Sequence, residues 1–181
     1  DLVEFRNELT KEIRKGHGTP EIMDALKRSY RVTAADIFDD YLIYIEWNRP
    51  NNRKFYLPRR PQLLPLVEAL QRLADGKINL LCISLPPGVG KTALALFFVC
   101  WLEGKNPELA SLLSSHNNEW LKGAYMECIR IMTDEEYLYR DVFPDSPLVE
   151  TDAKAMRLDM RKAKRFSSLQ FSSIESNNAG K

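Results

Sequence analysis

The residues best suited to chemistry are clustered in the segment 85–92, whose sequence is LPPGVGKT. Two closely spaced glycines let backbone N–H groups turn toward an anion, and a helix that follows points its positive end at the same charge. A lysine after them can reach the β- and γ-phosphates of a nucleotide, and a threonine hydroxyl can complete the coordination of Mg²⁺. The segment therefore predicts an ATP-binding loop in which Lys91 and Thr92 are catalytic and Thr92 is the metal ligand. The residues expected to contact the phosphates are Pro87, Gly88, Val89, Gly90, Lys91, Thr92 and Ala93.

The loop departs from the usual phosphate-loop pattern at one position. Leu85 stands where the consensus has its first glycine, and the Pro86-Pro87 pair supplies rigidity in place of conformational freedom. A chance Gly-Lys-Thr on an ordinary turn is the alternative, and the flanking segments disfavour it.

Those flanking segments are predicted from hydrophobic periodicity. Residues 78–84 form a short run rich in Ile and Leu, typical of a strand covered on both faces, and residues 92–102 are apolar almost all round, typical of a buried helix. A second strand is expected over 110–115, a second helix over 120–132 and a further strand over 166–173. The order strand, helix, strand, helix predicts an α/β fold with a parallel sheet and helical crossovers.

A helix beginning near residue 61 precedes the first strand, and its start carries candidate contacts for the nucleotide base. Gln62 can hydrogen-bond adenine through its amide, while Tyr56 or Arg60 can stack on the ring. The alternative for Gln62 is a plain polar residue at a helix start. The second strand is followed by His116, Asn117 and Asn118, which could sense nucleotide or touch DNA. Capping the next helix is the favoured interpretation, because asparagine is a common cap.

The first fifty residues are expected to be helical. Apolar residues recur at helical spacing over 2–13, 21–30 and 34–47, and Pro50 breaks the pattern. This part shows no recognisable chemistry. We therefore divide the chain into an N-terminal helical segment, 1–50, and an ATPase core, 51–181.

The composition is that of a globular protein in water. The chain has 181 residues, of which 44% are hydrophobic and 28% charged, with a net charge of +1. No apolar run is long enough to span a membrane and no secretion leader is found, so we expect no membrane partner. Cys82, Cys100 and Cys128 are predicted to be core thiols in a reducing compartment.

A basic stretch lies near the end of the chain. Residues 154–165 carry six lysines and arginines against one acid, Asp159. Such a cluster can neutralise the phosphates of a nucleic acid, and the alternative is a solvated helix face.

Several of these segments together resemble the ATPase domain of tailed-bacteriophage large terminases. The resemblance covers roughly residues 60–181, and the order and spacing of its elements are more specific than any single one. The matching elements are RPQ at 60–62, LLCISLPPGVGKT at 80–92, WLEGKNP at 101–107, LLSSHN at 112–117, EY at 136–137, VFPD at 142–145 and SLQFSSI at 168–174.

This resemblance implies a RecA-like phosphate-loop NTPase fold, a three-layer sandwich around a parallel sheet. It also implies ATP hydrolysis coupled to the movement of double-stranded DNA into a procapsid, in the cytoplasm of a bacterial host. The implied partners are a portal protein, a small terminase subunit and further copies of the chain in a ring. Complete proteins of the family carry a C-terminal nuclease domain.

Two departures from the family stand out. Gly88 occupies the position where many terminases have an arginine in the loop, and no apolar strand ending in Asp-Glu is present. We therefore interpret the chain as a fragment ending just before the acidic strand, and expect weak ATP binding and slow hydrolysis. Lys181 falls where relatives often place an arginine thought to act on a neighbour's nucleotide, and a plain terminal lysine is the alternative. An AAA+ or helicase-type ATPase and a nucleotide-binding assembly module without turnover remain the other hypotheses.

Overall fold

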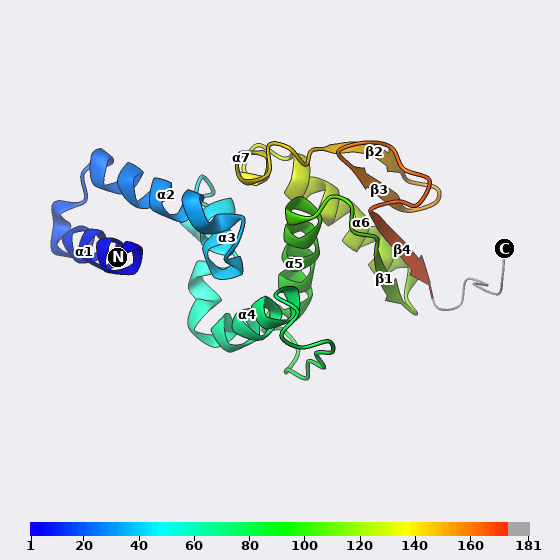
Figure 1. Cartoon of the computed structure of the whole chain (residues 1–181). Helices are drawn as coiled ribbons and strands as arrows, with labels where there is room; N and C mark the ends of the chain where they lie inside the picture. The colour runs from blue at the N-terminus through cyan, green and yellow to red at the C-terminus, as the bar shows by residue number, and fades with distance from the viewer. Residues whose placement is uncertain (174–181) are drawn as a thin grey trace.

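The computed structural model describes residues 1–173 as a mixed α/β protein, with the N-terminal helices at one end and the sheet at the other (Figure 1). The position of Lys181 lies outside the described residues. The helices are α1 (Leu2–Glu12), α2 (Pro20–Ala34), α3 (Phe38–Ile45), α4 (Arg60–Ala74), α5 (Lys91–Lys105), α6 (Asn118–Thr133) and α7 (Tyr139–Val142). The strands are β1 (Ser111–Ser115), β2 (Leu148–Asp152), β3 (Arg157–Met160) and β4 (Leu169–Ser173). Short helical turns cover Ile13–His17, Asn51–Arg53 and Leu57–Arg59.

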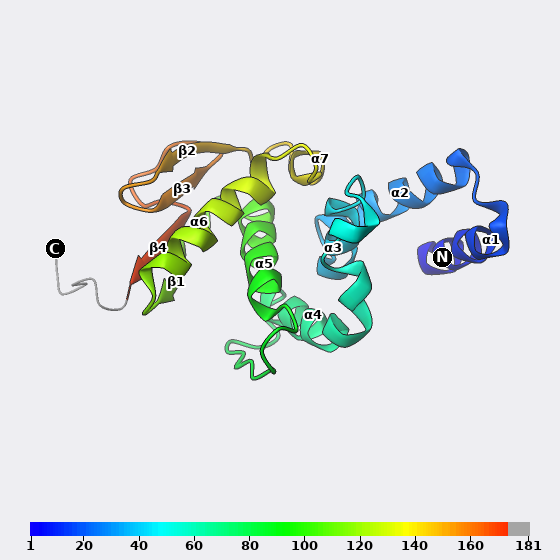
Figure 2. The ribbon, with the colours of Figure 1, turned by 180° about the vertical axis from the view of Figure 1, so that it is seen from behind.

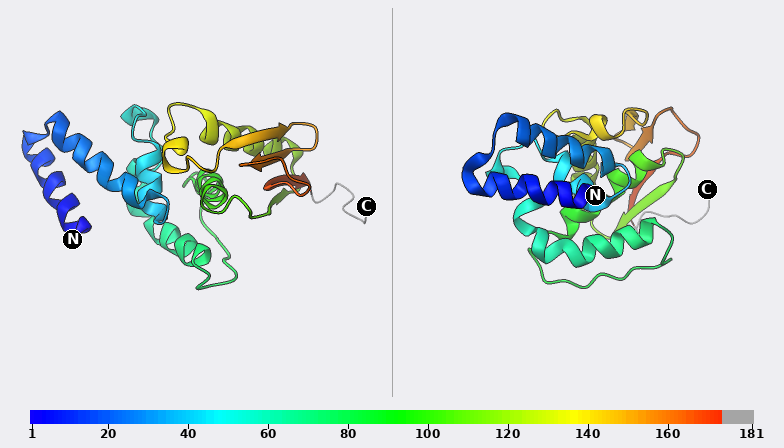
Figure 3. Two further views of the ribbon diagram at one scale, coloured as in Figure 1. Left: turned by 45° about the horizontal axis from the view of Figure 1, so that its top comes forward. Right: turned by 60° about the vertical axis from the view of Figure 1, so that its left-hand side comes forward.

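The predicted N-terminal helices are confirmed, and one arginine attaches the first of them to the next two. α1 has no buried residue of its own and projects from the body of the molecule (Figure 3). The Arg6 guanidinium is 2.9 Å from the Asp40 carboxylate and 3.1 Å from the Ser29 hydroxyl, and it lies over the Tyr30 ring at 4.1 Å. Because a buried ion pair needs several hydrogen bonds to offset desolvation, this network fixes where α1 docks.

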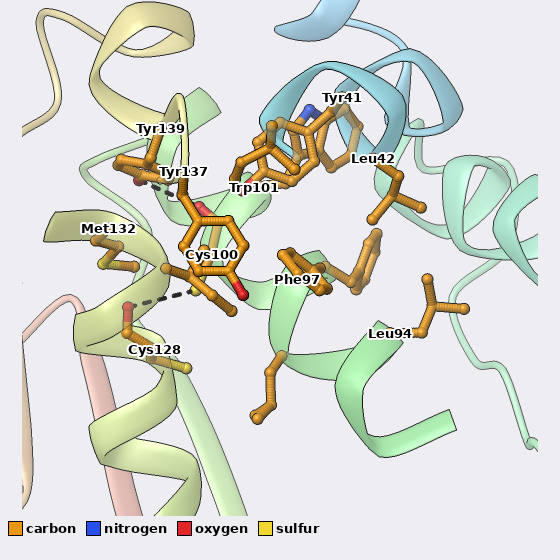
Figure 4. Close-up of a cluster of buried hydrophobic side chains, with 14 of the residues drawn as sticks. Tyr41, Leu42, Leu94, Phe97, Cys100, Trp101, Cys128, Met132, Tyr137 and Tyr139 are labelled. Carbon is orange, nitrogen blue, oxygen red and sulfur yellow. Dashed lines mark hydrogen bonds between the residues drawn. The ribbon is translucent and has the colours of Figure 1, made fainter. Parts of the chain in front are cut away.

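The core lies between α3, α5, α6 and α7, and it joins the first fifty residues to the rest of the chain (Figure 4). The rings of Phe38 on α3 and Trp101 on α5 have centroids 5.2 Å apart. The Tyr139 hydroxyl donates to the Cys100 carbonyl at 3.2 Å. Cys100 and Cys128 are buried free thiols, as predicted. α5 is buried on nearly all sides because the neighbouring helices surround it.

The sheet has four strands in the order β1-β4-β3-β2. Only β1 and β4 are parallel, with Leu113 opposite Phe171, whereas β4–β3 and β3–β2 are antiparallel. The sheet is therefore mixed, and the prediction of an all-parallel sheet holds for one pair only. α6 covers one face of the sheet (Figure 2), where the Tyr125 ring meets Phe171 edge-on at 5.6 Å.

The antiparallel hairpin of β2 and β3 was not among the predicted elements. It carries part of the basic stretch 154–165, so the helix-face alternative for that stretch is wrong. A buried carboxylate organises the loop that follows, because Asp159 accepts the N–H groups of Lys164 and Ser168, both at 3.1 Å. The predicted strand over 166–173 is confirmed as β4, and the one over 110–115 as β1.

The predicted strand over 78–84 is wrong. This segment is irregular, and Leu80 and Ile83 are 79% and 42% exposed. A strand requires a neighbour to pair its N–H and C=O groups, and no segment among residues 1–173 pairs with it. Cys82 is therefore exposed rather than in the core. No helix of the described chain has the length and apolar character that crossing a membrane requires.

Candidate nucleotide-binding loop

Two glycines shape the loop that precedes α5. Gly88 has φ 81° and Gly90 has φ 95°, backbone conformations that L-residues with a side chain rarely adopt. α5 begins immediately afterwards at Lys91, and Gly90 provides no side-chain cap. The first N–H groups of a helix have no partner inside it, so those of α5 are available to an anion. The helix predicted to follow the loop is thus confirmed, and it begins at the lysine.

An aromatic ring from an earlier segment of the chain packs against the loop. A Cβ built on Gly90 would lie 2.5 Å from the Phe55 ring, so the ring and the glycine are in direct contact. Phe55 stacks on Phe97 of α5, with centroids 5.8 Å apart and planes 17° apart. The Arg59 guanidinium lies 5.3 Å from the centroid of the Phe55 ring, and the Arg59 Cδ would lie 3.6 Å from a Cβ built on Gly90. The loop therefore rests on a platform, defined here as Phe55 with Phe97 and Arg59.

A buried carboxylate holds this platform in place. Glu46 is 2% exposed and accepts the N–H groups of Phe55 and Tyr56, each at 2.9 Å. The Arg49 guanidinium, 2.9 Å from the same carboxylate, neutralises its charge. Hydrogen bonds to a carboxylate are among the stronger ones in proteins, so they fix the backbone that carries the ring.

The lysine of the loop points back at the loop itself. Lys91 Nζ donates to the Leu85 carbonyl at 2.8 Å and is exposed, and the Thr92 side chain is exposed beside it. A cavity of about 450 Å³ opens here. Its lining residues are Gly88, Gly90, Lys91, Thr92, Ala93, Leu96 and Glu127. Five of the seven predicted phosphate contacts thus line one cavity. Of the other two, Pro87 directly precedes Gly88 and Val89 lies between the two glycines.

Glu127 of α6 was not predicted as a site residue. Its side chain is 36% exposed and lies 3.4 Å from the Arg130 guanidinium. Nothing in the sequence near Glu127 distinguishes it, because only the packing of α6 against α5 brings it to the loop. It adds a carboxylate to the cavity that holds Thr92. Among residues 1–173, no group of three or more His, Cys, Asp or Glu side chains could hold a metal ion.

The predicted base-binding residues do not line this cavity. Tyr56 is fully buried, and its hydroxyl donates to Asp39. Arg60 donates to the same carboxylate through Nε at 3.0 Å and Nη2 at 2.7 Å. This contact raises the pKa of the Arg60 guanidinium. Gln62 is exposed at the start of α4. The side chains that do reach the loop are one position earlier in the sequence, Phe55 and Arg59.

Asn117 performs the capping role that was favoured for it. Its side-chain oxygen accepts the N–H of Trp120 at 3.0 Å at the start of α6. His116 directly follows β1, and the side-chain cap of α6 comes from Asn117 rather than from His116.

The geometry of the loop fits a chain of phosphates with a metal ion beside it. Uncapped helix N–H groups, two left-handed glycines and a flexible lysine are suited to phosphate oxygens, and the oxygens of Thr92 and Glu127 are of the type that Mg²⁺ takes.

No protein-family model, no curated protein and no solved structure matches the chain.

Proposed function

We propose that the chain binds ATP with Mg²⁺ at residues 85–92 and that it is the motor domain of a DNA-packaging machine. One observation carries the first part: Gly88 and Gly90, both at positive φ, lead directly into Lys91 and the uncapped start of a 15-residue helix, and all three line one cavity. The second part, a phosphate-loop fold of the RecA-like type acting on double-stranded DNA, rests on the resemblance to large terminases. The proposed partners are therefore a portal protein, a small terminase subunit and further copies of the chain, in a bacterial cytoplasm.

In this proposal, each group at the loop has a separate role in binding the phosphates or in hydrolysis. The backbone N–H groups that open α5 hold phosphate oxygens, and the field of the helix favours their charge. Lys91 exchanges its bond to the Leu85 carbonyl for the β- and γ-phosphates, a change that needs only side-chain rotation. Thr92 offers its hydroxyl to Mg²⁺, which neutralises charge on the phosphates when it is bound. Glu127 orients the attacking water, since a carboxylate can accept its proton.

Nucleotide binding is tested by removing the lysine. We expect Lys91→Ala to abolish the binding of fluorescently labelled ATP, measured by anisotropy in the presence of Mg²⁺, because the phosphate charge then lacks its cation. Lys122→Ala is the matched control, since Lys122 is an exposed lysine of α6 that does not line the cavity. Equal affinity of wild type and Lys91→Ala would contradict the proposal.

The motor function is tested by turnover. We expect hydrolysis of ATP to be slow and to rise when duplex DNA is added, because a translocase couples the two. Glu127→Gln is expected to lower hydrolysis and leave ATP affinity unchanged. Binding with no turnover under either condition would favour an assembly module, and turnover indifferent to DNA would contradict a packaging motor.

A further inference from the structure

A row of side chains crosses the face of the sheet opposite α6. Leu112 on β1 lies opposite Gln170 on β4, and Gln170 lies opposite Arg157 on β3. Residues in register on neighbouring strands project to the same face of a sheet, so the three form one continuous row. The next residue along β4, Phe171, points the other way and packs against α6.

This face is open to solvent. Leu112 is 63% exposed and Arg157 is also exposed. A groove with a volume of about 340 Å³ runs along the row, and its wall comes from the loop before β4. Phe166 in that wall is 77% exposed, although it is a large aromatic ring. The groove is lined by Leu112, Arg157, Arg165, Phe166 and Gln170, together with small residues around the start of β1 and in the loop before β4.

The groove is positively charged and its two arginines are available. Neither Arg157 nor Arg165 forms an ion pair with a carboxylate of residues 1–173, and the Arg165 guanidinium lies 5.7 Å from the centroid of the Phe166 ring. The acid opposite Arg157 is Asp152, whose carboxylate accepts the N–H groups of Lys154 and Ala155 at 2.9 Å. The same stretch carries three further exposed basic residues, Lys154, Arg161 and Lys162, of which Lys162 lies 3.8 Å from the Glu108 carboxylate.

These features together match one class of ligand. An exposed aromatic ring offers a surface on which a base can stack, and arginines beside it can neutralise the phosphates of the chain that carries the base. The Gln170 amide adds a donor and an acceptor at the floor of the groove. A duplex keeps its bases stacked on one another, so an exposed ring gains nothing from it.

We infer that this sheet face, defined as Leu112, Arg157, Arg165, Phe166 and Gln170, binds single-stranded nucleic acid. Arg157 and Arg165 hold adjacent phosphates and Phe166 stacks on a base. The inference goes beyond the proposed nucleotide site, because no residue is shared between the groove and the cavity at residues 88–92.

The test is the binding of a fluorescein-labelled single-stranded oligonucleotide, followed by anisotropy without ATP. We expect Phe166→Ala to weaken binding by about tenfold, which is the usual contribution of one stacked base, and Phe166→Trp to retain it. The plot of log affinity against log salt concentration has a negative slope. We expect Arg157→Ala and Arg165→Ala each to make this slope shallower by about 0.7, the value for one lost phosphate contact. Arg72→Ala is the matched control, because Arg72 is exposed on α4 with no ion pair to a described carboxylate.

Three results would overturn the inference. They are no binding at low salt, equal binding of wild type and Phe166→Ala, and a loss of duplex affinity in Phe166→Ala as large as its loss of single-strand affinity. Circular dichroism of each variant shows whether it is folded, and Leu112→Lys gives an independent readout by adding charge to the groove, which should tighten binding. Lys91→Ala is expected to bind the oligonucleotide like wild type, so failure here and failure at the nucleotide loop are distinguishable.

Discussion

At the scale of single residues, the shape of the candidate nucleotide-binding loop depends on two glycines in different surroundings. Gly88 and Gly90 both have positive φ, but a Cβ on Gly88 would meet nothing within 4 Å, whereas one on Gly90 would lie 2.5 Å from the Phe55 ring. Gly88 is therefore required for its backbone conformation alone, and Gly90 for conformation and space together.

This difference predicts unequal effects of the same substitution. Gly88→Ala should lower the free energy of unfolding by about 1 kcal/mol, the cost of placing a side chain in the left-handed region. Gly90→Ala should cost about 1–3 kcal/mol more, because the Phe55 ring must also move. Urea unfolding measures both variants, and equal costs would show that the ring does not rest on the loop.

Glu103 is a buried acid outside the candidate sites. Its side chain is fully buried, and burial raises the pKa of its carboxyl to about 7, an effect that Ser111 and Lys164 only partly offset. The folded state therefore keeps a proton that the unfolded chain releases near its ordinary pKa of about 4.3. Since folding favours the protonated form, the stability it contributes is present below that value and is lost as pH rises toward 7.

The sign of this effect gives a prediction. As pH rises from about 5 to about 8, the free energy of unfolding of Glu103→Gln should increase by about 2–3 kcal/mol relative to that of wild type, because the amide does not ionise. Glu108→Gln, at an exposed glutamate, is the control. A difference between Glu103→Gln and wild type that does not change with pH would mean that the carboxyl ionises normally.

At the scale of elements, the helices were predictable and the sheet only in part. Helices α4, α5 and α6 follow from the spacing of their own apolar residues, because their backbone hydrogen bonds are local. A strand depends on partners that the local pattern does not specify. The apolar run 78–84 therefore suggested a buried strand, whereas β2 and β3, rich in charged residues, gave no signal.

The exposure of the 78–84 segment can be tested with neighbouring leucines. Leu80→Lys should change the free energy of unfolding by less than about 0.5 kcal/mol, because Leu80 is 79% exposed. Leu81→Lys should cost about 1–3 kcal/mol, because Leu81 packs against the core. Thermal or urea unfolding gives both values. A large loss of stability for Leu80→Lys would support the original prediction of a buried strand over 78–84.

At the scale of the whole molecule, the site depends on contacts between distant parts of the chain. The sequence predicted the loop itself, because its residues are consecutive, and it placed the base contacts at Tyr56, Arg60 and Gln62. It did not predict that the ring of Phe55 would support Gly90, or that Glu127 would line the cavity. Those positions follow from the packing of α5 against its neighbours, which no local pattern encodes.

The most direct test of the nucleotide-binding proposal is a crystal structure of the protein with ATP and Mg²⁺. We predict that the triphosphate lies against the backbone N–H groups of residues 88–92, with Lys91 Nζ moved from the Leu85 carbonyl to the phosphates. A loop left empty at saturating nucleotide, or one whose N–H groups face away from the bound phosphates, would contradict the account.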